Sequence, residues 1–345
     1  MTTAFDFGSF RLRSLCQAGP RLISRHCRTI YQILPTTDAW RGILGDLKIG
    51  YAEGPHAFTV IGDDAERVGG ICPIPATGIL PDGRLADDDP AARQMLAQLV
   101  DGILPSAIRP GEVCCMTLPG ASYMNRTSEN SELNLCTHLI EMQGYDVRIL
   151  SSSMAVLLAS SSSTEFTGIG LNFGESSCTV SLSRKGVEIA YCSIPVGGDW
   201  IDESLARSES QYIYDIDGSC YLDTDSVRVW REQLQSSIAE PQSESERTLR
   251  EKYDQMIERV LSECAAPLRA AADQHCLTEP LNMYCAGGTS QVIGFNRLIT
   301  RHVQTDHNFP LPVSSVRVVE DDGFTAARGC LINAEIESEM LRRVA

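Results

Sequence analysis

A short turn in the middle of the chain has the residues that a phosphate-binding loop needs. Residues 172–177 read Asn-Phe-Gly-Glu-Ser-Ser and separate two segments with strand-like alternation. A turn of this kind gathers backbone N–H groups and hydroxyls around one small volume, which is what binds phosphate oxygens. A third strand-like segment follows, and then a Gly197-Gly198-Asp199 corner at which a helix is expected to start. Residues 166–206 therefore predict a phosphate-binding site.

The N-terminus repeats this device about half a chain earlier. Asp6 ends a strand-like run, Gly8, Ser9 and Phe10 form a turn, and alternation resumes through Arg13. A strand followed by glycine and serine is most often an ordinary hairpin, so either turn alone is a weak signal. Two such loops in one chain suggest two related halves that grip one nucleotide.

Composition limits the classes of function. The chain has 345 residues, enough for two domains or one large bilobed unit, and 43% of them are hydrophobic. The net charge of −16 argues against nucleic-acid binding through a broad basic surface and against simple attachment to anionic lipid. The N-terminus enters a strand pattern directly, without a secretory signal, and no apolar run approaches the roughly 20 residues of a membrane span. We expect a cytoplasmic protein.

The residues that usually mark metal or hydrolase chemistry are present without their usual spacing. The thirteen cysteines are scattered, with no CxxC pair, and the six histidines form no HExxH pattern. There is no Gly-x-Ser-x-Gly elbow. Reduced, mostly buried thiols are the expectation.

The first half of the chain alternates strands and helices. A hairpin runs to about Cys16, and residues 28–65 form a small irregular region with short strands. Asp89 is a good N-cap for a helix with Pro90 at its first position. A strand at 113–118, a helix at 130–143 ended by Gly144, and a strand at 146–150 follow.

The second half repeats this order. Residues 151–163 form a short apolar helix flanked by serines, which is interpreted as the crossing between two lobes. After the glycine corner, residues 202–276 are mostly helical and heavily charged. A strand at 281–286 runs into Gly287-Gly288-Thr289, and a helix follows at about 292–300. The pattern predicts an α/β protein with two mixed sheets covered by helices, whose ligand lies where loops leave the strand ends.

Taken in order, the three glycine turns resemble those of the actin–Hsp70–hexokinase ATPase superfamily, and most of all those of bacterial actins of the MreB and MamK group. The resemblance covers most of the chain. Its matching segments are 6–10 and 172–177 as the two phosphate loops, 153–160 as the first connecting helix, 197–202 as the corner, 286–290 as the adenosine loop, and 321–330 as the closing helix. Residues 60–83 are similar to the small outer subdomain of bacterial actins.

The resemblance implies an actin-like fold of two lobes and four subdomains, with a nucleotide cleft between two RNase H-like mixed sheets. The first lobe would cover residues 1–150, with a small outer subdomain at about 31–69 between core segments 1–30 and 70–150. The second would cover residues 151–324, with core segments 151–202 and 280–324 and an outer subdomain at about 203–279. Residues 325–345 would return to the first lobe.

The resemblance also implies ATP or ADP with Mg²⁺ as ligands. Backbone N–H groups of Gly8, Ser9 and Phe10 would clamp the phosphates from one side, and those from Gly174 through Glu175 and Ser176 to Ser177 from the other. Asp6 would hold magnesium through water, and Arg13 would supply a positive charge. Gly197, Gly198 and Asp199 would complete the corner beside the nucleotide, and Gly287, Gly288 and Thr289 would pass close to the adenosine.

Three departures from the family pattern bear on activity. Asn172 stands where active relatives usually have Asp, and an amide cannot act as a general base. Ser153 stands where they usually have Glu or Gln to position the attacking water. Since phosphoryl transfer depends on positioning and charge, ATP hydrolysis is expected to be slow or absent. Val227 and Trp230 match positions that usually carry Glu and Lys near the adenine, and Trp230 either stacks on the base or packs within its helix.

Three functions remain open. The first is a bacterial actin-like cytoskeletal protein that binds ATP or ADP and polymerises with itself into filaments. The second is a non-polymerising adaptor with the same fold, which binds a partner or cargo protein. The third, a small-molecule kinase, is weakened by Asn172, which removes the most obvious catalytic acid. No amphipathic N-terminal helix precedes the first strand, which argues against direct membrane binding by that route.

Overall fold

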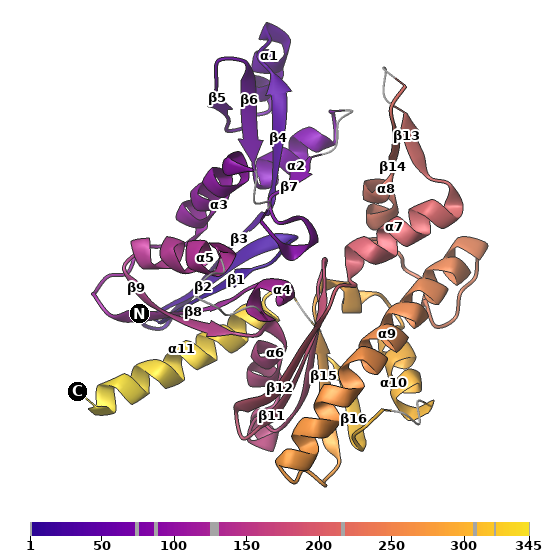
Figure 1. Ribbon diagram of the computed structural model, residues 1–345. Coiled ribbons are helices and arrows are strands. Elements are labelled where there is room, and N and C mark those ends of the chain that lie inside the picture. The colour runs from indigo at the N-terminus through magenta and orange to yellow at the C-terminus, as the bar shows by residue number, and fades with distance from the viewer. Residues whose placement is uncertain are drawn as a thin grey trace.

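The computed structural model describes residues 2–72, 76–85, 89–124, 131–214, 218–305, 309–320 and 322–344. Asp87 and Asp88, which precede Asp89 in the sequence, lie outside the described residues, as does Asp321 at the start of the predicted closing segment. Two five-stranded sheets form the centre of the molecule, and two smaller parts extend beyond them at one end (Figure 1).

The first sheet has the strand order β3-β2-β1-β8-β9. Strands β1, β2 and β3 are antiparallel neighbours, whereas β8 and β9 run parallel to β1. A parallel pair needs a crossover connection, and helices supply it here. The bounds are β1 (Thr2–Phe7), β2 (Arg11–Ala18), β3 (Arg21–Arg28), β8 (Glu112–Thr117) and β9 (Tyr145–Leu150).

The second sheet repeats this topology with the order β12-β11-β10-β15-β16. Its first three strands are again antiparallel, and the last two run parallel to β10. The bounds are β10 (Gly168–Phe173), β11 (Cys178–Arg184), β12 (Val187–Ile194), β15 (Leu281–Ala286) and β16 (Val313–Val318). Two halves of the same topology are what the paired loops in the sequence suggested.

Helices cover the sheets and build separate cores. Helices α3 (Pro90–Ile103) and α5 (Ser131–Met142) bury apolar side chains on one face of the first sheet, and α11 (Thr325–Val344) lies against the other. Helices α9 (Glu244–Gln274) and α10 (Phe295–Thr305) cover the second sheet, and α6 (Ser152–Ser160) packs on its opposite face (Figure 1). This arrangement confirms the predicted α/β class.

Helices α6 and α11 cross very closely between the two sheets. A Cβ added at Gly329 of α11 would lie 1.9 Å from the Ala155 carbonyl oxygen of α6, so only glycine permits this approach. Serines surround the start of α6, and Ser151 Oγ caps it by accepting from the Met154 N–H group. The helix that was predicted to connect the lobes therefore lies in the middle of the molecule.

The start of α3 follows the sequence rules. The Asp89 carboxylate accepts a hydrogen bond from the Ala92 N–H group, and Pro90 occupies the first helical position. The helix buries Met95, Leu96 and Leu99 against the first sheet. Gly144, which was expected to end α5, has the left-handed φ of 89°.

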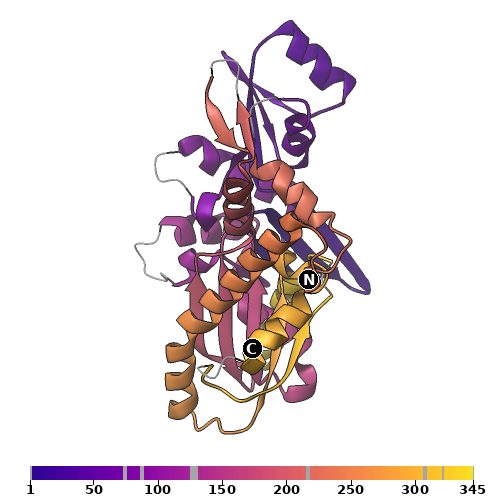
Figure 2. The same ribbon diagram turned by 90° about the vertical axis from the view of Figure 1, so that its right-hand side faces the viewer.

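The two outer parts lie side by side at the top of Figure 1 and also in the turned view of Figure 2. One is a four-stranded sheet in the order β5-β6-β4-β7 with its own apolar cluster. Its elements are β4 (Ile30–Pro35), α1 (Asp38–Asp46), β5 (Ala52–Glu53), β6 (Ala57–Ile61), α2 (Asp63–Gly69) and β7 (Thr77–Gly78). The other consists of α7 (Gly198–Glu209), β13 (Tyr212–Tyr214), β14 (Cys220–Leu222) and α8 (Thr224–Glu232).

The sequence did not predict strands β3 and β16, the hairpin β13–β14, or helices α1 and α2. Strand β3 has six consecutive exposed residues, so it lacks the alternation that marks a half-buried strand. Strand β16 has no buried residue, since three of its six residues are exposed and three are half-buried. The hairpin β13–β14 interrupts the region of residues 202–276, which was expected to be mostly helical, and it is short and exposed on both strands.

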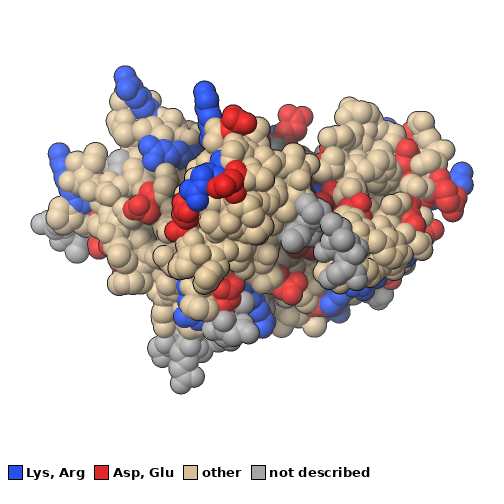
Figure 3. Space-filling view, turned by 90° about the horizontal axis from the view of Figure 1, so that it is seen from above, with Lys and Arg blue, Asp and Glu red and all other residues tan. Residues whose placement is uncertain are grey.

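The remaining elements are short and connect the larger ones. They are the 3₁₀ turns Pro81–Gly83, Ser162–Thr164 and Gly288–Gln291 and the helix α4 (Gly120–Met124). Each of the thirteen cysteines is a free thiol, and most are buried. Among the described residues no helix combines the length and apolar character needed to cross a membrane. Acidic and basic side chains are interspersed on the end of the molecule that Figure 3 shows.

Candidate functional site

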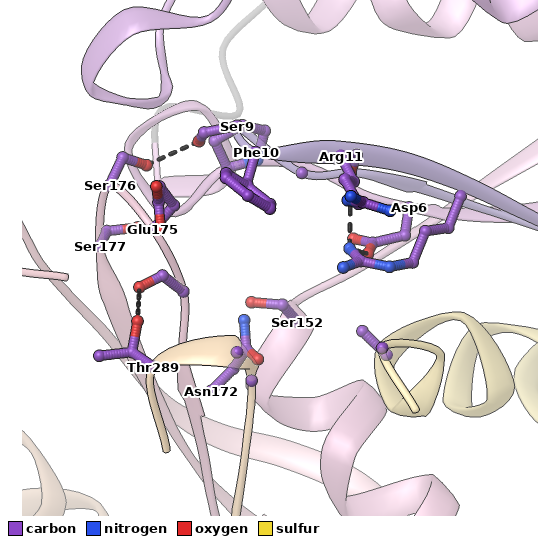
Figure 4. A pocket seen from close by; sticks show the side chains of 18 of the residues that line it. Asp6, Ser9, Phe10, Arg11, Ser152, Asn172, Glu175, Ser176, Ser177 and Thr289 are labelled. Carbon is purple, nitrogen blue, oxygen red and sulfur yellow. Dashed lines mark hydrogen bonds and ion pairs between the residues drawn. The ribbon is translucent and has the colours of Figure 1, made fainter. Parts of the chain in front are cut away.

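A cavity of about 510 Å³ lies between the two sheets, and both predicted loops open onto it. Figure 4 shows side chains from the first loop, the second loop, α6 and the turn after β15 facing this space. The lining residues include Asp6, Gly8, Ser9, Phe10, Arg11, Arg13, Ser152, Asn172, Gly174, Glu175, Ser176, Ser177, Arg228, Arg231, Glu232, Gly287, Gly288 and Thr289.

The first loop follows β1 and turns tightly at Gly8. A Cβ at Gly8 would lie 2.5 Å from the Arg11 carbonyl oxygen, so a side chain there would force the turn open. Thr29 holds the loop from behind, since its hydroxyl donates to the Gly8 carbonyl at 2.9 Å and its N–H group donates to the Phe10 carbonyl at 3.1 Å. The loop therefore has a fixed shape.

Asp6 lies at the end of β1 and is held by both neighbouring strands. Thr117 of β8 donates its hydroxyl to Asp6 Oδ1 at 2.6 Å, and Arg13 of β2 donates Nη1–H to Asp6 Oδ2 at 3.2 Å. These residues are the direct neighbours of Asp6 in the strand registers. The carboxylate is thus fixed in position at the edge of the cavity.

The groups near Asp6 fit a magnesium ion that is held through its own water molecules, as the sequence suggested. No group of three or more His, Cys, Asp or Glu side chains suited to a metal occurs within the described ranges. Magnesium usually keeps several waters and takes one or two carboxylates together with substrate phosphates. A carboxylate has about four acceptor sites, so Asp6 can still accept from metal-bound water while it is bonded to Thr117 and Arg13.

The second loop is closed by its own backbone and supported from behind. Gly174 donates its N–H group to the Ser177 carbonyl at 3.1 Å, so that N–H group is used within the turn. The first N–H groups of α7 donate to the loop, from Gly198 to the Gly174 carbonyl at 3.1 Å and from Asp199 to the Glu175 carbonyl at 3.0 Å. The helix start thus fixes the loop.

This geometry places the predicted glycine corner behind the loop rather than on the cavity wall. Gly197, Gly198 and Asp199 are absent from the lining of the cavity. A Cβ at Gly197 would lie 2.1 Å from the Glu175 carbonyl oxygen, so the corner requires glycine for packing against the loop. In this structure the three residues support the loop from behind, and their contact with a ligand stays a prediction.

Glu175 and Asp199 form a pair of acidic groups at this contact. Burial and the neighbouring Asp199 carboxylate raise the pKa of Glu175 to about 8, and burial also raises the pKa of Asp199. Ionising both of these neighbouring carboxyl groups costs free energy, because the two negative charges repel each other. Near neutral pH, Glu175 therefore adds little negative charge to the loop.

A buried ion pair lies beside these acids. Arg231 of α8 donates to both carboxylate oxygens of Asp202, at 2.6 and 2.8 Å. Burial raises the pKa of Asp202 to about 6 despite this partner. The two hydrogen bonds of this pair join α8 to α7. Both side chains are almost fully shielded from solvent, which strengthens the pair.

The turn after β15 makes its own close approach. Gly287 has φ of 100°, and a Cβ there would lie 2.3 Å from the Phe173 carbonyl oxygen. Thr289 donates its hydroxyl to the Gly174 carbonyl at 2.8 Å, which links this turn to the second loop. Gly287, Gly288 and Thr289 all line the cavity, as the sequence suggested.

Two predicted residues are placed elsewhere. Ser153 is fully buried and its hydroxyl lies 2.6 Å from that of Ser181, whereas the preceding residue, Ser152, lines the cavity. The two residues differ by one position, which on a helix is a rotation of about 100°, so the hydroxyl that faces the cavity is that of Ser152.

Trp230 also lies away from the cavity, because it packs against the apolar core of the second sheet. The α8 side chains that face the cavity are Arg228, Arg231 and Glu232. Residues three and four apart share one helix face, so 228, 231 and 232 belong together while 227 and 230 face the core. That spacing is the signal in the sequence that could have identified them.

Arg11 and His26 also line the cavity and were not predicted. Arg11 is the first residue of β2, and its guanidinium lies 3.4 Å from the His26 ring on β3. Since β3 was not recognised from the sequence, its contribution to the cavity could not be predicted. Arg11 adds positive charge on the side of the first sheet.

The sequence profile of the Volactin family matches residues 1–334. The chain belongs to the Volactin family. Comparison with curated proteins finds no match.

Among solved structures, the chain is similar to that described as "MamK double helical filament", with 14% identity, a TM-score of 0.69 and coverage of 97% of this chain and 99% of that one. It is also similar to MreB 5 of Spiroplasma citri bound to AMPPNP, with 13% identity, a TM-score of 0.67 and coverage of 100% and 98%. A non-polymerising point mutant of MamK bound to AMPPNP matches with a TM-score of 0.55, 14% identity and coverage of 97% and 98%. At this identity the likeness shows the fold, and the predicted actin-like fold related to bacterial actins is confirmed.

Proposed function

We propose that this Volactin-family protein is an actin-like cytoskeletal protein that binds ATP or ADP with magnesium and polymerises into filaments. The observation that supports it most is the cavity between two sheets of the same topology, with one loop from each sheet on its wall. Two of the similar structures are described as bound to AMPPNP, and one is described as a filament. Both properties are proposed for this chain.

The residues at the cavity fit a nucleotide in a definite orientation. The first loop and the second loop would hold the phosphates from opposite sides, and Arg11 and Arg13 would offset their charge. Asp6 would hold magnesium through water, where the metal would neutralise phosphate charge. The adenosine would lie toward Gly287 and Gly288, with Glu232 of α8 as an acceptor for its ribose hydroxyls.

The same residues predict slow hydrolysis. Asn172 lies at the cavity where a carboxylate would be needed as a base, and its amide cannot accept a proton from water in that role. The hydroxyl of Ser152 is 2.9 Å from that of Thr179, so this short side chain is held against β11. We therefore propose a protein that binds nucleotide and cleaves it slowly or not at all.

We propose the lobe division set out from the sequence, with boundaries near residues 150 and 324, and a cytoplasmic location. The second candidate is a non-polymerising adaptor that holds nucleotide statically and binds a partner or cargo protein. The observation that favours it is the neutral pair Asn172 and Ser152 at the cavity, since a filament that turns over needs hydrolysis.

Pelleting separates the two candidates. The purified protein is centrifuged at high speed with ATP, ADP or no nucleotide at several salt concentrations, and the pellets are imaged by electron microscopy. Filaments in the ATP pellet are the expected result. A protein that copurifies with nucleotide but stays in the supernatant under every condition would contradict polymerisation and favour the adaptor.

A further inference from the structure

A second cavity adjoins the first. It has a volume of about 370 Å³ and lies between the outer parts of the molecule. Four residues line both cavities and thus form the wall between them, namely Ser9, Phe10, Glu175 and Arg228. Two of them belong to the first half of the chain and two to the second, so the wall is built across the cleft.

Two direct contacts hold this wall together. The hydroxyls of Ser9 and Ser176 lie 2.7 Å apart and join the two loops (Figure 4). The Phe10 ring lies close to three guanidinium groups, those of Arg28 at 3.4 Å from the ring centroid, Arg228 at 5.1 Å and Arg11 at 5.6 Å. Only that of Arg228 comes from the second half of the chain. A guanidinium within about 6 Å of an aromatic ring is attracted by its electron-rich face.

Further contacts hold Arg28 and Arg228 in place beside the Phe10 ring. Arg28 donates Nη1–H to the Phe10 carbonyl at 3.4 Å, and its Nε lies 3.1 Å from Glu66 Oε1. Arg228 is paired with Asp225 of its own helix at 2.8 Å. Arg28 and Phe10 belong to the first half of the chain and Arg228 to the second, so separating the halves must break the contact between the ring and Arg228.

Contacts between the halves in the middle of the molecule are of a different kind. There α6 and α11 cross at Gly329, and Tyr123 of α4 donates its hydroxyl to Glu188 of β12 at 2.7 Å. A closely packed helix crossing is typical of a hinge, about which two halves rotate. A few side-chain contacts between loops can break, so they are typical of the side on which a cleft opens. The wall is on the side that would open.

We propose that Phe10 and Arg228 form a clasp that closes the cleft over the bound ligand, so that opening of this clasp sets the rate of nucleotide release. This inference rests on the proposed function, because it assigns regulation to the same site. Phe10 and Arg228 act here as positioning residues that hold the halves together.

The charge of the second cavity supports the proposal that the closed wall retains the nucleotide. Its lining carries the carboxylates of Asp82, Asp199, Asp202, Glu203 and Asp225 and the guanidinium groups of Arg28 and Arg228. Three of these carboxylates are ion-paired, Asp202 with Arg231, Glu203 with Arg207 and Asp225 with Arg228. Carboxylates still outnumber guanidinium groups in this lining, so it opposes the passage of phosphates, whereas Arg228 at the wall attracts them.

Release of a fluorescent ATP analogue, measured by stopped flow with excess unlabelled ATP, tests the clasp. The variants are Phe10→Leu, Arg228→Gln and the double variant. Each single variant should release the analogue about three- to tenfold faster, the range that a cation–π contact supplies. The double variant should release it no faster than the faster single variant, because both changes break the same contact between the halves, that of the Phe10 ring with Arg228.

Arg41→Gln is the matched control. The Arg41 guanidinium lies 5.2 Å from the Phe58 ring, and both residues belong to one outer part, so this variant loses a similar contact that does not cross the cleft. Its release rate should equal that of the unmodified protein. Equal rates for all variants, or single effects that multiply in the double variant, would overturn the proposal.

Hydrogen exchange of the ligand-free protein separates this proposal from the proposed function. Phe10→Leu should raise amide exchange in α8, whereas Arg41→Gln should leave it unchanged. If no nucleotide binds, the proposed function fails and exchange alone decides whether the clasp exists. Unchanged exchange in α8 of Phe10→Leu would overturn the clasp in either case.

Discussion

The two loops occupy equivalent places in two sheets of the same topology, yet the residues around them differ. Asp6 on β1 has Arg13 and Thr117 as its neighbours on the flanking strands, whereas Asn172 on β10 has Thr179 and Ala286. The first position therefore holds a charged carboxylate between a cation and a hydroxyl. The second holds a neutral amide with no cation beside it in the sheet. Equivalent backbone positions thus carry different chemistry, and the difference favours holding a nucleotide over cleaving it.

The largest expected effect is on the rate of ATP hydrolysis, and it comes from giving the second loop a carboxylate like that of the first. Asn172→Asp together with Ser152→Gln restores a base and a side chain long enough to position water. Because a positioned base contributes about 10²–10⁴-fold, phosphate release from ATP should rise by about a hundredfold. Steady-state phosphate release measures it, and the two single variants should give smaller increases. If the double variant stays at the rate of the unmodified protein, the missing groups are not what limits hydrolysis.

Removing the charge from the first loop should have the next largest effect. Asp6→Asn keeps an acceptor oxygen but loses the carboxylate that Arg13 and Thr117 hold. Magnesium-dependent affinity for ATP should fall by about tenfold or more, since hydrogen bonds to charged groups are worth about 1.5–3 kcal/mol. Calorimetric titration with and without magnesium measures this. An equal affinity loss in both conditions would contradict the role of Asp6 at the metal.

Helix α8 gives a smaller effect that tests the corrected position of the site. Glu232→Gln should weaken ATP binding by about threefold, as expected for one hydrogen bond made weaker. Trp230→Phe is the comparison, because Trp230 packs against the core of the second sheet rather than the cavity. Its affinity should not change. The reverse outcome would restore Trp230 as a contact of the base.

The smallest expected effect concerns pH and the support of the second loop. The folded-state pKa of Glu175 is raised from 4.5 to about 8, so the folded protein binds this proton more tightly than the unfolded chain does. Stability should therefore fall as pH rises from about 4.5 to 8. Glu175→Gln removes this cost, and its Tm should exceed that of the unmodified protein by about 2 °C at pH 8 and by less at pH 5. Parallel pH profiles of Tm for the two proteins would contradict the raised pKa.

The sequence predicted which turns open onto the cavity, because three glycine turns in this order are more specific than any one of them alone. It also predicted α3 and its cap at Asp89, because local hydrogen bonds decide a helix start. It did not predict β3, whose consecutive exposed residues give no periodic signal. Ser152 was missed for a different reason, since a shift of one residue on a helix changes the face and packing settles which face meets the cavity. Glu232 was missed because the helical spacing of residues 228, 231 and 232 was not used.

The most direct test of the account is the nucleotide content of the purified protein, paired with phosphate release over time. The protein is denatured, the released nucleotide is identified by chromatography, and phosphate is followed after ATP is added to a fresh sample. We expect bound ATP or ADP close to one nucleotide per chain, with phosphate release near the background rate. A protein that contains no nucleotide and binds none when ATP and magnesium are added would contradict it.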